Sequence, residues 1–325
     1  MSKQRLWTGI VGFLGIMVLI LDSKTALLGA RDGIDLCIRT VIPSLFPFFL
    51  LSNLLTGSLM GAEFRILRPI GCLFGLHKST ESLLIPAFLG GYPAGAQSID
   101  TAFRSGQLSK RDAEKLLAFC NNAGPAFLFG MIGPLFPGLR YAWMLWGIHI
   151  LSALLVSRIF PINPSSIKIP NSRTCGIMEA MTSSLKVVAQ VCGWVTVFRV
   201  LIAFLNRWVM WLFPVAAQVT IIGLLELSNG CCSLGLIDSI PVRFTLCACL
   251  LAFGGLCITM QTSSAVNGLS MKYYLAGKAL QTIFSFLICL CIRYTWMILP
   301  ASCVYFLLRI GKHRINSRNS VTIGV

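Results

Sequence analysis

The sequence predicts an all-α polytopic membrane protein, built from two inverted repeats with broken or re-entrant helices. Composition supports the membrane class, because 56% of the 325 residues are hydrophobic and only 12% are charged. Soluble domains carry about 25% charged residues. One glycine-rich signature returns in the second half of the chain and supports the repeats. Since a helix needs about 20 apolar residues to cross the hydrocarbon core, this length allows roughly 8–10 membrane segments.

The first 35 residues predict one membrane helix followed by a connector. Lys3 and Arg5 precede an apolar run from residue 6 to residue 21. No small-residue cleavage site closes this run cleanly, so we interpret it as an uncleaved helix rather than a signal peptide. Residues 22 to 35 mix acidic and basic side chains, and we interpret them as a mixed-charge connector.

Residues 36 to 160 form the first predicted repeat with two following helices. Its first span is expected to kink, because Pro43 and Pro47 lie inside it. The next apolar pieces, between residues 69 and 103, are too short for separate crossings, so we predict a re-entrant hairpin. Basic residues flank this hairpin on both sides, which agrees with a segment that leaves on the side it entered.

Three helices are predicted after the hairpin. Residues 104 to 118 have the pattern of an amphipathic surface helix, with Ser109 as its N-cap and Asp112 in its first turn. Residues 116 to 136 and 141 to 160 are then expected to cross the membrane outward and back.

The remaining chain predicts a linker, a second repeat and a tail. Residues 161 to 186 are polar and contain prolines, and we interpret them as a cytoplasmic linker. The second repeat, at 187 to 292, is expected to contain one long span and two spans broken at 226–230 and 254–255. Residues 293 to 325 predict a C-terminal membrane segment with a basic tail.

The two predicted repeats share a glycine pair that is followed at the same spacing by a glutamine. Gly90–Gly91 precedes Gln97, and Gly254–Gly255 precedes Gln261, each pair after an Ala-Phe dipeptide. Paired glycine-broken segments in two halves of a membrane protein indicate a transport site at the repeat interface. Counting the predicted crossings gives the halves opposite orientations. The alternative is that these glycines serve only helix packing.

Glycines and hydrogen-bonding side chains at the helix breaks are the candidate substrate-binding residues. A break frees backbone N–H groups that favour an anion, and an amide can donate to a carboxylate. Alternatively, the amides only cap the break. The candidate for coupling a proton or sodium ion is Glu226, unless it pairs with Arg199, which itself can bind a carboxylate or snorkel to the interface. The substrate-binding candidates are Gly90, Gly91, Gln97, Asn121, Asn122, Gly124, Asn229, Gln261 and Arg199.

No catalytic motif emerges from the sequence, so we expect neither an enzyme nor a cofactor. The 13 cysteines form no C-x-x-C pair and only three histidines are present, so no metal site is predicted. The net charge of +16 comes from basic residues that lie mostly between apolar runs, where they set topology and contact anionic lipid. The expected partners are therefore the lipid bilayer and a small-molecule substrate, with no nucleic acid, and a homo-oligomer stays open.

Motifs in both halves carry a family resemblance. The first repeat contains G-G-Y-P-A-G-A-Q at 90 to 97, E-K-L-L at 114 to 117 and F-C-N-N-A-G-P at 119 to 125. Together these resemble the sporulation integral membrane proteins of the YlbJ type, within the nucleoside-recognition (Gate) domain family. Two later motifs resemble a second copy of that domain, namely L-E-L-S-N-G at 225 to 230 and F-G-G-L at 253 to 256. The resemblance covers roughly residues 35 to 290 and makes the two repeats Gate-like.

The resemblance implies a role in sporulation, in the cell membrane of a spore-forming bacterium and specifically in the outer forespore membrane. The family is associated with delivery of dipicolinate, pyridine-2,6-dicarboxylate, so the implied partner is a dipicolinate-like anion that moves from the mother cell toward the forespore. The Gate name points instead to a nucleoside or another small metabolite. A third alternative is a sporulation membrane scaffold that transports nothing and uses its broken helices only for packing.

Overall fold

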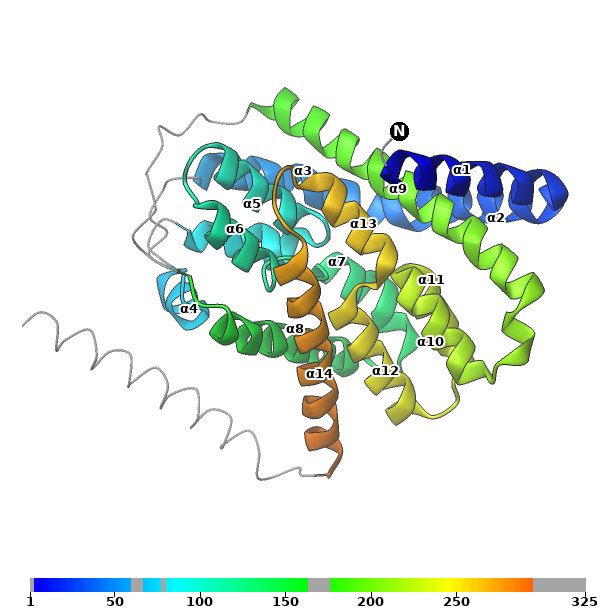
Figure 1. The fold of residues 1–325 in the computed structure, drawn as a ribbon. Coiled ribbons are helices and arrows are strands. Elements are labelled where there is room, and N and C mark those ends of the chain that lie inside the picture. The colour runs from blue at the N-terminus through cyan, green and yellow to red at the C-terminus, as the bar shows by residue number, and fades with distance from the viewer. Residues whose placement is uncertain (1–2, 60–66, 77–79, 163–175, 295–325) are drawn as a thin grey trace, which may run out of the picture.

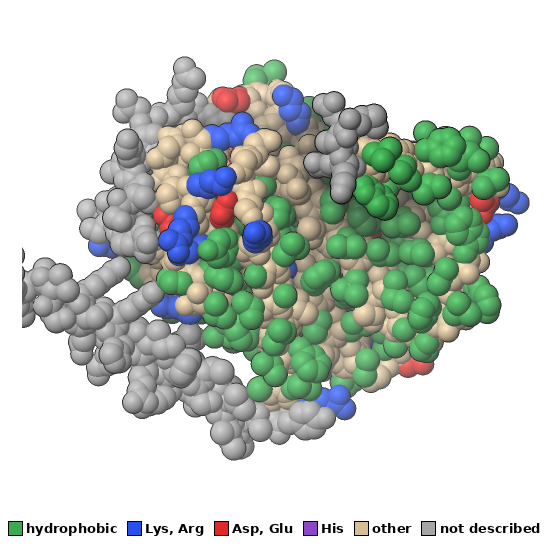
Figure 2. All heavy atoms as spheres, in the orientation of Figure 1, with side chains coloured by type: hydrophobic (Ala, Val, Ile, Leu, Met, Phe, Trp, Pro, Cys, Tyr) green, Lys and Arg blue, Asp and Glu red, His purple; other side chains and the backbone are tan. Residues whose placement is uncertain are grey.

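The computed structural model describes residues 3–59, 67–76, 80–162 and 176–294, and within these ranges the chain is helical and has no strand. Five helices among these described residues are long and apolar enough to cross a membrane. Hydrophobic side chains cover much of the face shown in Figure 2, while Lys and Arg lie mainly toward its margins. The predicted all-α polytopic membrane class is therefore confirmed. The five candidate spans are Ser23–Leu54, Leu139–Ile159, Ile177–Trp208, Ile240–Ala265 and Lys272–Arg293.

The N-terminal part is a continuous run of helices. It consists of α1 (Lys3–Leu21), α2 (Ser23–Leu36), the π-helix η1 (Cys37–Val41) and α3 (Ile42–Leu59). The interpretation of residues 22 to 35 as a connector needs correction, because α2 fills this range and belongs to a candidate span. Its N-cap is Asp22, which accepts a hydrogen bond from the Thr25 N–H at 3.3 Å.

The charged stretch is helical because α2, η1 and α3 lie antiparallel along the long helix α9 (Ile177–Trp208). At one end, Asp22 pairs with Arg207 at 3.0 Å. At the other end, the Asn53 amide donates to the Ser184 hydroxyl at 2.9 Å. The capping residue Asp22 therefore meets an arginine of α9 instead of lipid.

Two glycines set how closely α2 approaches α9. A Cβ atom added to Gly29 or to Gly33 would lie 2.9 Å from a backbone Cα atom of α9. Glycines four residues apart allow such close packing of membrane helices. The G-x-x-x-G spacing was the sequence signal for a packed helix at this place.

The π-turn η1 comes just before Pro43, the first of the two prolines that predict a kink in the first span. Pro43 has no N–H to donate. The N–H of Ile42 bonds to the carbonyl five residues back, at Cys37, and Pro47 lies inside α3. The hydroxyl of Ser44 donates to the Thr40 carbonyl at 2.6 Å. The irregularity that the prolines predict thus takes the form of a wider helical turn, a form that is frequent at functional sites.

The predicted hairpin is present in the described part of the first repeat. After α4 (Arg68–Phe74), the short helix η2 (Glu81–Leu83) and the π-helix η3 (Pro86–Gly90) lead to a turn, and α5 (Ala94–Arg104) packs back against them. Gly91 at the turn has a φ of 79°, which glycine adopts readily. A Cβ on Gly95 would lie 3.2 Å from Cα of Ala87, so the two arms touch directly behind the turn.

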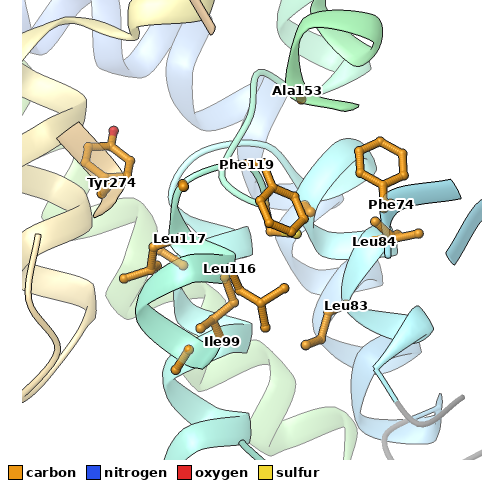
Figure 3. Close-up of a cluster of buried hydrophobic side chains, with 14 of the residues drawn as sticks. Phe74, Leu83, Leu84, Ile99, Leu116, Leu117, Phe119, Ala153 and Tyr274 are labelled. Atoms are coloured by element: carbon orange, nitrogen blue, oxygen red, sulfur yellow. The ribbon is translucent and has the colours of Figure 1, made fainter. Parts of the chain in front are cut away.

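The helix α6 (Lys110–Leu117) begins as predicted but is not a surface helix. Ser109 caps it and accepts a hydrogen bond from the Asp112 N–H at 3.1 Å. However, Leu116 and Leu117 are 0% exposed. They belong to the core cluster of Figure 3, together with Tyr274 of α14 (Lys272–Tyr294). The apolar side of α6 is covered by α5 and α14, so its amphipathic pattern marks a core contact.

A break follows α6. Residues 118–124 are not helical, and the chain continues in α7 (Pro125–Phe127), the π-helix η4 (Leu128–Ile132) and η5 (Gly133–Leu135). The helix α8 (Leu139–Ile159) completes the first half. The predicted span at 116–136 is thus a broken helix with an extended middle.

The second half contains another hairpin and another broken helix. After η7 (Met210–Leu212), α10 (Val215–Leu225) and α11 (Leu227–Ser233) lie side by side, and a Cβ on Gly230 would collide with the Gly223 backbone. After η8 (Leu234–Leu236), α12 (Ile240–Phe253) is followed by α13 (Gly255–Ala265), which continues away from it in Figure 1. Gly254 and Gly255 have φ of 83° and 81° at this break.

Both halves therefore show the order hairpin, then broken helix, but the glycine pairs matched in the sequence occupy different places. Gly90–Gly91 lies at the turn of a hairpin, whereas Gly254–Gly255 lies between the two parts of a broken helix. The physical reason is that a glycine with positive φ serves either kind of break. The opposite orientation of the halves stays a prediction.

The predicted linker and the predicted C-terminal segment lie partly outside the described residues. The helix α9 begins at Ile177, inside the predicted linker of residues 161 to 186. Residues 163–175, most of the predicted C-terminal segment at 295–325, and residues 77–79 of the first apolar break lie outside the described residues.

Candidate substrate site

The hairpin of the first half crosses its broken helix at two glycines. A Cβ added to Gly124 would lie 3.1 Å from both N and Cα of Gly91 and 3.1 Å from the Leu89 carbonyl oxygen. These are backbone atoms of a packed interior and cannot move aside cheaply. The turn of the hairpin is thus seated directly against the non-helical segment 118–124.

The second half makes the same kind of crossing. A Cβ added to Gly255 would lie 3.0 Å from the Gly223 carbonyl oxygen and 3.4 Å from the backbone N of Leu227. The break between α12 and α13 therefore sits against the α10–α11 hairpin. In both halves, irregular backbone is covered by protein, as a membrane environment requires.

A cavity of about 50 Å³ lies where these elements meet. Four of the predicted site residues line it, namely Gly91, Gly124, Glu226 and Gln261. Tyr92 also lines it. This volume holds a few water molecules, whereas pockets for small molecules usually measure roughly 300–1000 Å³. The cavity in this structure is therefore too small for a typical small-molecule ligand, and binding one would require it to widen.

Glu226 is the N-cap of α11. Its carboxylate accepts hydrogen bonds from the Ser228 N–H at 3.0 Å, the Asn229 N–H at 2.7 Å and the Asn229 side-chain amide at 2.7 Å. The side chain is 2% exposed. Capping is thus the role that the geometry shows for this carboxylate.

Arg199 reaches Glu226 only through Asn229, so the direct pair considered from the sequence is replaced by a relay. The Arg199 guanidinium donates to the side-chain amide oxygen of Asn229 at 2.8 Å and pairs with Asp32 at 3.2 Å. Arg199 and Asn229 line a separate, open pocket of about 540 Å³ with Asp32 and Arg39. These two predicted site residues therefore lie beside the cavity and not in its wall.

Asn121 and Asn122 lie in a second, fully buried polar cluster. Asn121 donates to the Thr262 hydroxyl at 2.8 Å, which ties the first broken helix to α13 of the second half. The side-chain oxygen of Asn122 accepts from the Gln281 side-chain amide at 3.0 Å and from Lys278 at 3.4 Å. Both asparagines are 0% exposed and line no part of the cavity.

The remaining two candidates are not brought to the cavity. Gly90 packs beside α3, where an added Cβ would lie 2.9 Å from the Ser52 hydroxyl. Gln97 is half-buried on α5 and does not line the cavity. Its counterpart in the matched signature, Gln261, does line it.

Sequence reasoning missed Lys278 and Tyr92. Lys278 is 1% exposed on α14 and lies 5.3 Å from the centre of the Tyr92 ring. Tyr92 in turn donates its hydroxyl to the Leu251 carbonyl at 2.7 Å, so it joins the first hairpin to α12. The available signal was a lysine inside an apolar run, since an ionisable residue in a membrane span marks a functional site by default.

Comparison with known proteins gives a partial match. The chain is 31% identical to the sporulation integral membrane protein YlbJ of Bacillus subtilis (strain 168) over 136 residues, which is 39% of this chain and 32% of the relative. It thus spans about a third of the length of this curated relative. The match supports homology to a sporulation integral membrane protein. No protein-family model matches the chain, and no solved structure matches it.

Proposed function

We propose that this protein is a sporulation membrane transporter. It moves a small anionic metabolite, most specifically dipicolinate, from the mother cell toward the forespore across the outer forespore membrane. The observation that best supports this proposal is that a hairpin crosses a broken helix in each half, and that both crossings border one cavity. Broken helices around a central site are the usual construction of secondary transporters.

The small cavity supports a carrier whose site is contracted in this structure. A dicarboxylate does not fit into about 50 Å³, so the two crossings separate during the cycle. A scaffold would need neither the cavity nor polar side chains in its wall. Gln261 lines that wall, although its side chain is only 5% exposed.

The test is uptake of labelled dipicolinate into liposomes that contain the purified protein, with and without a proton or sodium gradient. We expect uptake above that of protein-free liposomes. Unlabelled dipicolinate should compete with it and uridine should not. Effective competition by uridine would instead assign a nucleoside as substrate. Absence of uptake by folded protein would contradict the proposal and favour the scaffold.

A matched pair of variants tests the cavity itself. Gln261→Ala removes a lining amide, and we expect its uptake rate to fall about tenfold or more. Ser264→Ala alters the exposed side of the same helix, where the hydroxyl bonds only to the Met260 carbonyl at 2.8 Å, and should leave uptake unchanged. Equal uptake by both variants would remove the cavity from the transport path.

A further inference from the structure

We propose that Lys278 supplies the positive charge that selects a doubly charged carboxylate substrate. This rests on the proposed transport function and names a residue that determines its specificity. Lys278 lies in the candidate span 272–293 and is 1% exposed. A lysine in such a place is costly unless an anion compensates its charge.

The contacts of Lys278 are all with neutral groups. Its ammonium donates to the side-chain amide oxygen of Gln281 at 2.9 Å and to the side-chain amide oxygen of Asn122 at 3.4 Å. Its other neighbours are the rings of Tyr92 and Tyr274, whose centres lie at 5.3 Å and 5.9 Å. An ammonium has three donors, and the two amide oxygens use only two of them, one at a long distance.

No carboxylate among the described residues serves as the counter-charge. The ion pairs found there join other residues. The carboxylate nearest the cavity, Glu226, is occupied by the backbone of α11. Asp100 is buried too, but it accepts from the Asn267 N–H at 2.9 Å and pairs with Arg104 at 2.7 Å. An anion from outside the described chain is therefore the partner that this ammonium lacks.

The position of Lys278 relates it to the cavity. Tyr92 lines the cavity, and the ammonium lies over its ring. Asn122, which contacts the ammonium, is two residues from Gly124 in the cavity wall. A movement of the hairpin turn that carries Tyr92 would bring the ammonium into contact with the cavity. A substrate carboxylate would then meet Lys278, with Gln281 and Asn122 holding the ammonium in place.

The experiment measures equilibrium binding to the full-length protein in lipid nanodiscs. The ligands are pyridine-2,6-dicarboxylate and its monoamide, which lacks one charge but keeps the shape. For the unaltered protein we expect the monoamide to bind about tenfold or more weakly. In Lys278→Gln this difference should shrink to about threefold or less, and Lys278→Arg should restore most of it. Lys272→Gln, which removes an exposed charge from the same helix, should behave as the unaltered protein.

The outcomes separate this inference from the proposed function. If the unaltered protein transports the dicarboxylate but Lys278→Gln keeps the full preference for two charges, Lys278 is not the selecting residue and the transporter stands. If the unaltered protein neither binds nor transports carboxylates, both proposals are overturned. Should Lys278→Gln not fold, equal affinities of the unaltered protein for the two ligands would still overturn the inference, because the second charge would then have no cationic partner.

Discussion

Glu226 illustrates, at the scale of single residues, how a carboxylate inside an apolar segment can be used by its own helix. Three N–H donors converge on it, and Asn229 passes the interaction on to Arg199. Glu226 was predicted as a site residue because it is a charged residue inside an apolar run. Its charge alone does not show whether it caps a helix. Whether Glu226 binds a coupling ion or only caps α11 is therefore a question for substitution experiments.

Substitution of Glu226 separates these roles. Glu226→Ala leaves buried N–H groups unpaired and should lower the free energy of unfolding by about 1–3 kcal/mol, seen as a lower Tm in detergent. Glu226→Gln keeps one acceptor oxygen and should lose less. If Glu226→Gln still transports with its full response to a proton gradient, Glu226 is a cap and carries no coupling proton.

Gly124 is a residue of the first crossing at which an added side chain should be costly. Gly124→Ala places a methyl group 3.1 Å from backbone atoms of Gly91, so we expect a loss of about 1–3 kcal/mol in unfolding free energy. The matched control is Gly130→Ala, since an added Cβ there meets nothing within 4 Å. Thermal unfolding of both variants is the measurement, and an unchanged Tm for Gly124→Ala would argue against the close crossing.

Residue types in the sequence identified the glycine breaks well and the polar cluster poorly. Gly91, Gly124 and Gln261 were predicted from broken apolar runs, because the break itself is visible in the sequence. The partners of Asn122 were not, since Lys278 and Gln281 lie more than 150 positions further along the chain. Such pairing depends on tertiary packing, and no local pattern encodes it.

Elements were predicted best where a helix is uniformly apolar. The span predicted at 141–160 agrees with α8, and the span predicted to break at 254–255 agrees with α12 and α13. The helix α2 was interpreted as a connector because its charges hid the glycine spacing, and α6 as a surface helix because its polar side was assigned to water. In both cases, the side of the helix that the sequence did not assign to a protein contact packs against another helix.

The contact between α2 and α9 gives a prediction at this scale. Gly33→Ala would put a Cβ 2.9 Å from the Thr196 Cα, pushing the helices apart and lowering the Tm. Gly193→Ala on α9 meets nothing within 4 Å and should hold or raise the Tm, because alanine favours a helix by about 1 kcal/mol over glycine. A higher Tm for Gly33→Ala would contradict the packing.

At the scale of the whole molecule, the two halves are joined where Asn121 bonds to Thr262 at 2.8 Å. Because the cavity is too small for a dicarboxylate, the proposed transport requires the halves to separate. We therefore expect that cysteines at both positions, in a background with exposed Cys72 and Cys232 replaced by serine, stop uptake under oxidation. Reduction should restore it, and each single cysteine should be insensitive. Undiminished uptake by cross-linked protein would show that the halves stay together.

The length of α9 also limits the bilayer thickness in which this fold is most stable. Its 32 residues extend over about 48 Å at a rise of about 1.5 Å per residue. The hydrocarbon layer is about 30 Å thick. The helix must tilt or project into water, and its antiparallel partner, also 32 residues long at Ser23–Leu54, follows it. A thicker bilayer should reduce that hydrophobic mismatch. The acyl-chain length of the surrounding lipid is thus expected to affect the stability of this helix pair more than that of the 21-residue α8.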